Sequence, residues 1–128
     1  MKMKVWVLVA GFAVCLAAPL AAHHSWTADY DGGKPVTVKG VVSKVEWTNP
    51  HTHFYVDVKN PDGTVKTWNF EMASTLALER GGWTRKTLPV GTEVTISGFG
   101  GRAVMERAIA SSITTAEGKA LFVGKPGQ

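Results

Sequence analysis

The chain has 128 residues, a formal net charge of +4 and a single cysteine. This length fits one domain, and a lone cysteine excludes an internal disulfide framework. No cluster of lysine and arginine follows the basic N-terminus, so we expect no nucleic-acid partner.

The first 22 residues have the pattern of a cleavable signal peptide. Two lysines give a basic start, and residues 5–18 form an apolar core that is too short to span a bilayer comfortably as a helix. Pro19 ends that core, and cleavage after Ala22 fits the small and apolar residues before it. Cleavage after Ala21 is one alternative, and an uncleaved N-terminal anchor is another.

Cleavage after Ala22 leaves a mature chain of 106 residues (128 − 22) that begins at His23. Two of the basic residues leave with the signal, so the mature balance is 12 − 10 = +2. Cys15 leaves as well, which gives a mature chain without a disulfide or a reactive thiol. We predict a monomeric, periplasmic protein that meets the membrane only during export.

The mature sequence predicts an N-terminal segment (residues 23–35), an all-β domain (residues 36–123) and a short tail (residues 124–128). A long strand rich in β-branched residues is expected over residues 36–47. Its apolar face changes near Gly40, which predicts a bulge or a sharp coil there.

The next two strands alternate cleanly between apolar and polar side chains. They are expected over residues 52–58 and 64–72, joined by the strong hairpin signal at residues 60–63. The apolar positions that share the inner face are Phe54, Val56, Val58, Trp68, Phe70 and Met72.

A short helix is predicted next, with Ser74 as its N-cap and Gly81 as its left-handed end. Two further strands are expected over residues 93–99 and 104–114, followed by a short apolar piece at residues 120–123. This order predicts a small five-stranded OB-like barrel with one short helix between strands three and four. An SH3-like barrel and an open β-sandwich are the alternatives.

The four histidines form two pairs, His23-His24 at the mature N-terminus and His51 with His53 at the second strand. Residues two apart on a strand face the same side, so His51 and His53 can converge on one metal ion. An N-terminal histidine also offers its α-amino group, which suits Cu(II), with Zn(II) as the rival. The alternative is a cleavage scar and two ordinary surface histidines.

The tryptophans are mostly expected in the core, because small barrels need bulky fillers. Trp26 is the exception, since it lies near the histidine terminus; with Asn49 and Tyr55 it is a candidate for a ligand-binding face.

The sequence has no nucleophile motif, phosphate loop or dinucleotide fingerprint, so we expect no catalytic residue. The prediction is a binding module for a metal ion. The alternatives are metal-free binding of a peptide, envelope component or small molecule and, least favoured, a small copper redox enzyme.

Several strings together resemble a family of small secreted bacterial proteins catalogued as a domain of unknown function. They span most of the mature chain and include His23-His24-Ser25, Trp47-Thr48-Asn49-Pro50-His51, Trp68-Asn69-Phe70-Glu71 and Gly82-Trp83-Thr84-Arg85. The resemblance implies an exported OB-like barrel and brings no established activity. It also implies that a shared site would use His23, His24 and His51. His53 lies outside these strings, and we expect it to be an optional ligand of the metal site.

Overall fold

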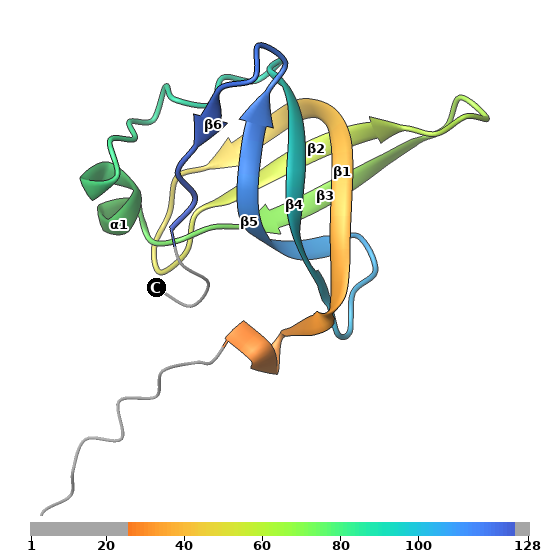
Figure 1. Cartoon of the computed structure of the whole chain (residues 1–128), viewed down its shortest axis with the longest axis horizontal. Coiled ribbons are helices and arrows are strands. Elements are labelled where there is room, and N and C mark those ends of the chain that lie inside the picture. The colour runs from red at the N-terminus through yellow and green to blue at the C-terminus, as the bar shows by residue number, and fades with distance from the viewer. Residues whose placement is uncertain (1–25, 125–128) are drawn as a thin grey trace, which may run out of the picture.

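The computed structural model describes residues 26–124, so the expected signal peptide, His23 and His24 lie outside the described residues. The described chain forms a β-barrel with one short α-helix at its side (Figure 1). Within this range, no helix has both the length and the apolar character needed to cross a membrane.

The elements follow the predicted order. A short 3-10 helix, η1 (Trp26–Ala28), precedes the barrel, and the α-helix α1 (Thr75–Arg80) lies between the third and fourth strands. The strands are β1 (Tyr30–Glu46), β2 (His53–Lys59), β3 (Val65–Glu71), β4 (Glu93–Gly101), β5 (Arg107–Thr115) and β6 (Ala120–Leu121).

Five of these strands form a closed ring. Antiparallel neighbours run in the order β3-β2-β1-β4-β5, and parallel pairing of residues 107–109 with residues 69–71 joins β5 back to β3. The two-residue strand β6 adds a short antiparallel pair to β5. This topology confirms the predicted all-β, five-stranded OB-like barrel with a helix between strands three and four.

The first strand is longer than the sequence predicted. We expected it to start at residue 36, because the Gly-Gly-Lys-Pro stretch before it is typical of a turn. In the structure, β1 begins at Tyr30, which pairs with Gly101 of β4. The register shifts between Tyr30 and Pro35, so the extension is an irregular strand that the turn signal concealed.

The bulge of β1 lies further along than predicted. The pairing with β2 shifts between Val42 and Lys44, beyond the position predicted near Gly40. Val42 is buried and Val41 is 44% exposed, so the inner face of the strand continues through Val42. Gly40 has a different role, since a Cβ there would overlap the carbonyl oxygen of Asp57 on β2. The glycine therefore permits close approach of two strands and the bulge follows it.

The core contains the side chains that the alternating pattern predicted. Phe54 and Phe70 are fully buried and stack with ring centroids 5.3 Å apart, and Trp68 packs on Phe70 at 5.9 Å. Trp83 is 5% exposed and donates a hydrogen bond of 2.6 Å from Nε1 to the carbonyl oxygen of Phe122. The tryptophans of the barrel thus contribute to the core, as expected.

The short helix begins and ends as predicted, but the left-handed residue after it comes one position later than predicted. The hydroxyl of Ser74 accepts a hydrogen bond from the backbone N–H of Ala77, as an N-cap does. Gly81 has a φ of −82°, and the left-handed conformation falls on Gly82, with a φ of +94°. Gly81 instead leaves room for the ring of Phe122, which a Cβ would overlap.

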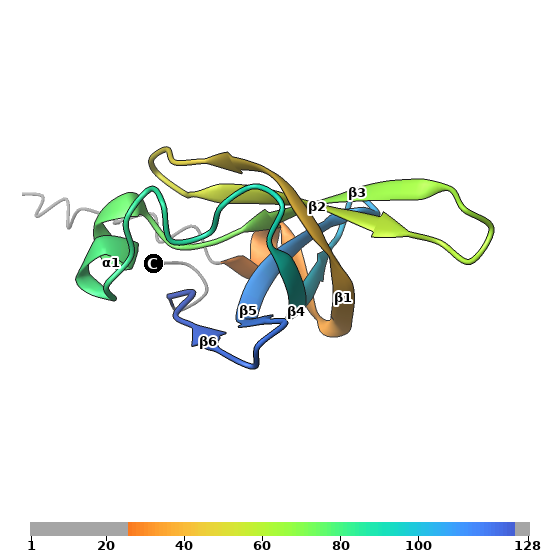
Figure 2. The same cartoon turned by 90° about the horizontal axis from the view of Figure 1, so that it is seen from above.

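The β1–β2 loop (residues 47–52) is tied to the start of α1. The Oδ1 atom of Asn49 accepts hydrogen bonds from the backbone N–H and the hydroxyl of Thr75, at 3.2 and 2.9 Å. The peptide bond between Asn49 and Pro50 is cis. Figure 2 shows this loop and α1 at the same end of the molecule, opposite the projecting β2–β3 hairpin. Asn49 therefore anchors the loop to the start of α1. A ligand of the kind predicted for this side chain would have to bind while Oδ1 keeps its two hydrogen bonds to Thr75.

Candidate functional site

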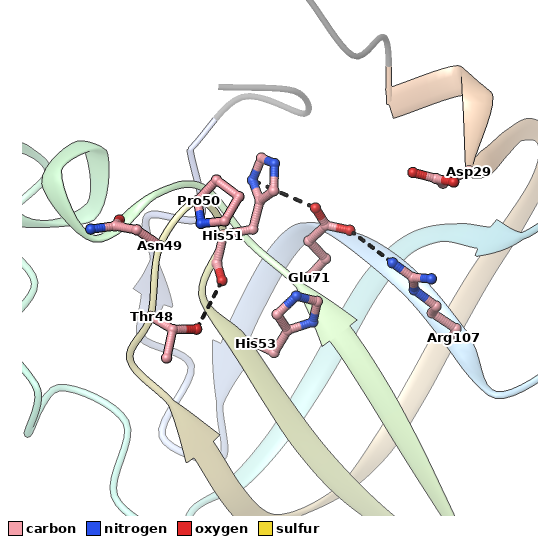
Figure 3. A pocket seen from close by; sticks show the side chains of 8 residues that line it. All are labelled: Asp29, Thr48, Asn49, Pro50, His51, His53, Glu71 and Arg107. Atoms are coloured by element: carbon pink, nitrogen blue, oxygen red, sulfur yellow. Dashed lines mark hydrogen bonds and ion pairs between the residues drawn. The ribbon is translucent and has the colours of Figure 1, made fainter.

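A pocket of about 410 Å³ opens where the β1–β2 loop meets the end of β3 and the start of β5 (Figure 3). We call it the histidine pocket. It contains both described histidines, which the two-residue spacing predicted would face the same region. Its lining residues are Asp29, Thr48, Asn49, Pro50, His51, His53, Glu71 and Arg107.

Glu71 is the central charged group of this pocket and is only 8% exposed. One carboxylate oxygen, Oε2, accepts a hydrogen bond from the hydroxyl of Tyr30 and lies 3.6 Å from the guanidinium of Arg107. The other oxygen, Oε1, lies 3.5 Å from Nδ1 of His51. A carboxylate this buried needs such partners, and the three groups supply them from β1, β5 and the β1–β2 loop.

Tyr30 and Arg107 contact each other as well as Glu71. Arg107 donates from Nε to the hydroxyl of Tyr30 at 3.0 Å, and its guanidinium lies 5.2 Å from the centre of the tyrosine ring. Burial, followed by the hydrogen bond to Glu71, raises the pKa of Tyr30 well above its usual range. Burial lowers the pKa of Arg107, but the interactions with Tyr30 and Glu71 outweigh it and raise that pKa overall. The tyrosine is therefore neutral and the arginine charged in the folded protein.

His53 lies on the other side of Glu71 from His51 in Figure 3 and is fixed by β3. Its Nδ1 is 2.9 Å from Oδ1 of Asn69. The amide nitrogen of Asn69 donates to the hydroxyl of Tyr55 at 3.5 Å, and that hydroxyl donates to Glu46 at 3.4 Å. Tyr55, a predicted ligand-face residue, is thus one member of a polar chain across the outer surface of the β1–β2–β3 sheet.

The N-terminal segment is held beside the histidine pocket. Arg102, in the β4–β5 loop, donates from its backbone N–H to the carbonyl of Asp29 and from Nε to the carbonyl of Thr27, both at 2.9 Å. Trp26 stacks on Phe99 of β4 with ring centroids 5.3 Å apart. Trp26, predicted as part of a ligand face, therefore packs on the barrel and is not among the residues that line the pocket.

A second pocket, of about 560 Å³, borders the β1–β2 loop at Trp47. We call it the tryptophan pocket. The sequence placed its two indoles in the core, and they do pack there: Trp83 is buried, whereas Trp47 is partly buried. Its lining residues are Trp47, Glu79, Trp83, Thr84, Arg85 and Lys86.

Sequence reasoning missed the buried network of Tyr30, Glu71 and Arg107. The three residues are far apart in the chain and come together only through the pairing of Tyr30 with Gly101 and of β3 with β5. The one local signal was a charged residue, Glu71, directly after the buried Phe70. Of the predicted metal ligands, the structure describes His51 and His53, and it brings both to one pocket.

The fold and the pockets define a small OB-fold protein with surface sites suited to binding. Residues 11–109 match a family of unknown function, DUF6152, and the chain belongs to that family. No curated protein matches the sequence. The predicted membership of a family of unknown function is thus confirmed, and that family supplies no activity to transfer.

Two solved structures are similar to this chain. One is the mitochondrial single-stranded DNA binding protein Rim1 from S. cerevisiae, with 9% identity, a TM-score of 0.52 and coverage of 69% of this chain and 95% of that chain. The other is the N-terminal domain of the PriB protein from Thermoanaerobacter tencongensis, with 21% identity, a TM-score of 0.45 and coverage of 66% and 97%. At such identity the likeness to Rim1 shows the fold alone. The expected absence of a nucleic-acid partner stays a prediction.

Proposed function

We propose that this protein is an exported, periplasmic binding module that holds Cu(II), with Zn(II) as the rival metal, at the histidine pocket. The ligands would be His51 together with the mature N-terminus, His23 and His24, and His53 would be an optional ligand. One observation carries the proposal, namely the contact of the His51 ring with the carboxylate of Glu71.

This contact prepares His51 for a metal. Nδ1 of His51 faces Oε1 of Glu71 at 3.5 Å. The negative charge of this carboxylate favours a neutral ring that carries its proton on Nδ1, which leaves the lone pair on Nε2 for a metal. Histidines that bind metals commonly have a carboxylate or carbonyl oxygen against the other ring nitrogen, which fixes the tautomer and the ring orientation.

His53 has an equivalent arrangement with an amide oxygen. Its Nδ1 lies 2.9 Å from Oδ1 of Asn69, which leaves Nε2 as the unprotonated nitrogen of the neutral ring. Both histidines of the pocket thus have one nitrogen occupied by an oxygen partner and one nitrogen able to act as a ligand.

The charge of the pocket also favours a cation. Two carboxylates, Asp29 and Glu71, stand against one guanidinium, that of Arg107, so the lining carries a net charge of −2 + 1 = −1 with neutral histidines. A divalent ion would reverse the sign of this local charge, whereas an anion would add to it.

The N-terminus is needed to complete the site. Within residues 26–124, no group of three or more histidine, cysteine or acidic side chains is arranged to hold a metal. Asp29 lines the pocket directly after the 3-10 helix Trp26–Ala28, and His24 stands two residues before Trp26 in the sequence. The proposal therefore takes its remaining ligands from the segment that leads to the pocket.

The test uses protein purified from the periplasm. Its intact mass and N-terminal sequence, with a metal analysis of the same sample, establish whether the chain starts at His23 and carries copper. Calorimetry with Cu(II) and with Zn(II) then measures affinity. We expect Cu(II) to bind with a Kd of about 1 µM or below, and His51→Ala to weaken that binding by about tenfold or more.

Two variants serve as comparisons. Adding Gly-Ser-Gly-Ser before His23 separates the α-amino group from that residue's ring and keeps both histidines out of third place, where a histidine would itself chelate Cu(II). It changes no described residue and should weaken Cu(II) binding as much as His51→Ala does. His53→Ala should have a smaller effect. A mature protein that contains no copper and shows no micromolar affinity for Cu(II) would overturn the proposal and favour a metal-free binding module instead.

A further inference from the structure

We propose that the tryptophan pocket binds a saccharide that carries a carboxylate group. Its volume, about 560 Å³, lies within the usual range for small-molecule sites. The proposal does not depend on the metal site, because the two pockets share no lining residue and the tryptophan pocket is formed entirely by described residues.

The aromatic wall of the pocket is suited to the apolar face of a sugar ring. Trp83 uses its only polar atom, Nε1, in the 2.6 Å hydrogen bond to Phe122, so its ring has only carbon atoms left for other contacts. Trp47 is partly buried against the core and is a more exposed residue than Trp83. A pyranose can lay its C–H face on such an indole and bury apolar area there while its hydroxyls remain free.

The charged rim supplies partners for those hydroxyls. Glu79 accepts hydrogen bonds, and Arg85 and Lys86 donate them. All three side chains are exposed, and within the described part of the chain none of them forms an ion pair. The rim therefore offers free acceptors and donors, as a ring of sugar hydroxyls requires.

The balance of charge at the rim selects among saccharides. One negative and two positive side chains give a net charge of +1. A neutral sugar leaves one cation without a partner, whereas a uronic acid or another carboxylated sugar pairs with it. The guanidinium of Arg85 suits this task, because it can bind a carboxylate through two parallel hydrogen bonds.

The loop that carries both cations is already ordered. The backbone N–H of Thr84 donates to the hydroxyl of Thr87 at 2.8 Å, and that of Lys86 donates to the hydroxyl of Thr84 at 3.2 Å. The backbone of Thr87 returns a hydrogen bond to the carbonyl of Thr84 at 3.1 Å. Binding then requires ordering of side chains only, which reduces its entropic cost.

The experiment compares an acidic with a neutral sugar. The mature protein is titrated with trigalacturonate and with galactotriose, and binding is followed by calorimetry and by indole fluorescence. EDTA is present throughout, so a metal in the histidine pocket takes no part and the two proposals fail separately. We expect saturable binding of trigalacturonate and at least about fivefold weaker binding of galactotriose.

Four variants locate the site. Trp47→Ala should weaken binding of both sugars by about tenfold, and Trp47→Phe should restore most of the affinity because it keeps an aromatic face. The double change Arg85→Ala and Lys86→Ala, on an exposed loop, should remove the preference for the acidic sugar. Lys59→Ala, a charge change away from the pocket, should have no effect.

Three results would overturn the proposal. The first is no saturable binding of trigalacturonate to the wild-type protein up to about 10 mM. The second is equal binding of triglutamate, since charge alone would then explain the affinity. The third is binding of trigalacturonate that neither Trp47→Ala nor the double change affects, because the sugar would then sit elsewhere.

Discussion

The histidine pocket and the tryptophan pocket border the same loop, residues 47–52, but they are built in different ways. In the histidine pocket the charged groups satisfy one another: Glu71 contacts His51, Tyr30 and Arg107, which come from separate parts of the chain. In the tryptophan pocket all the residues except Trp47 belong to one stretch, residues 79–86, and the charges are exposed. The first pocket is therefore part of the framework of the barrel, and the second is attached to its surface.

This contrast predicts different costs for removing a carboxylate from each pocket. Glu71→Ala leaves Arg107 without its acidic partner in a half-buried position and should lower the free energy of unfolding by about 3 kcal/mol or more. Glu79→Ala, at the exposed rim of the tryptophan pocket, should change it by less than about 0.5 kcal/mol. Urea denaturation of both variants measures the difference, and equal losses would show that the histidine pocket is not part of the framework.

A second prediction concerns alkaline pH. Because the folded state raises the pKa of Tyr30, the unfolded chain loses its phenolic proton first, at a pH near 10. The stability that depends on neutral Tyr30 is thus fully present below that pH. It is lost as pH rises further, by about 1.4 kcal/mol per pH unit.

Tyr30→Phe should remove this part of the pH dependence and should also lower stability at neutral pH by about 1–2 kcal/mol, because two hydrogen bonds disappear. The chain has only two tyrosines, so Tyr55→Phe is a matched control. Denaturation curves recorded between about pH 8 and 11, on both sides of the ordinary tyrosine pKa, distinguish the two variants. The same alkaline slope in both variants would contradict the assignment.

The smallest predicted effect is on the loop that the pockets share. Asn49→Ala removes the two hydrogen bonds to Thr75 and should cost about 1 kcal/mol. Because residues on both sides of Asn49 line pockets, the change should weaken Cu(II) binding and alter the fluorescence of the indoles together. Asn60→Ala, which removes a hydrogen bond to Thr64 in the distant hairpin, should leave both readouts unchanged.

The sequence was a good guide to the parts of the fold that depend on local pattern. Alternation placed Phe54 and Phe70 in the core, and turn residues placed the β2–β3 hairpin, because both signals act over a few neighbours. The start of β1 was missed, since the glycines and proline there are typical of turns, yet pairing with β4 extends the strand. Tertiary pairing overrode local preference at that point.

The candidate site was predictable only in part, for the same reason. The spacing of His51 and His53 indicated a common location, and they line one pocket. Their partners depend on register across strands: His53 pairs opposite Glu71, and Asn69 lies opposite Tyr55. No spacing along the chain encodes these neighbours, so Glu71 could not be assigned as the partner of His51 before the barrel was closed.

The β2–β3 hairpin extends beyond the barrel in both views (Figures 1 and 2), and its turn is closed by its own hydrogen bonds, from Asn60 to Thr64 and from Gly63 to Asn60. Neither pocket includes a residue of this turn. An exposed, self-contained turn of this kind tolerates inserted sequence well. The hairpin is therefore a suitable insertion site. An affinity tag or a fluorophore placed between Asp62 and Gly63 would allow the protein to be captured or tracked without any modification of its N-terminus.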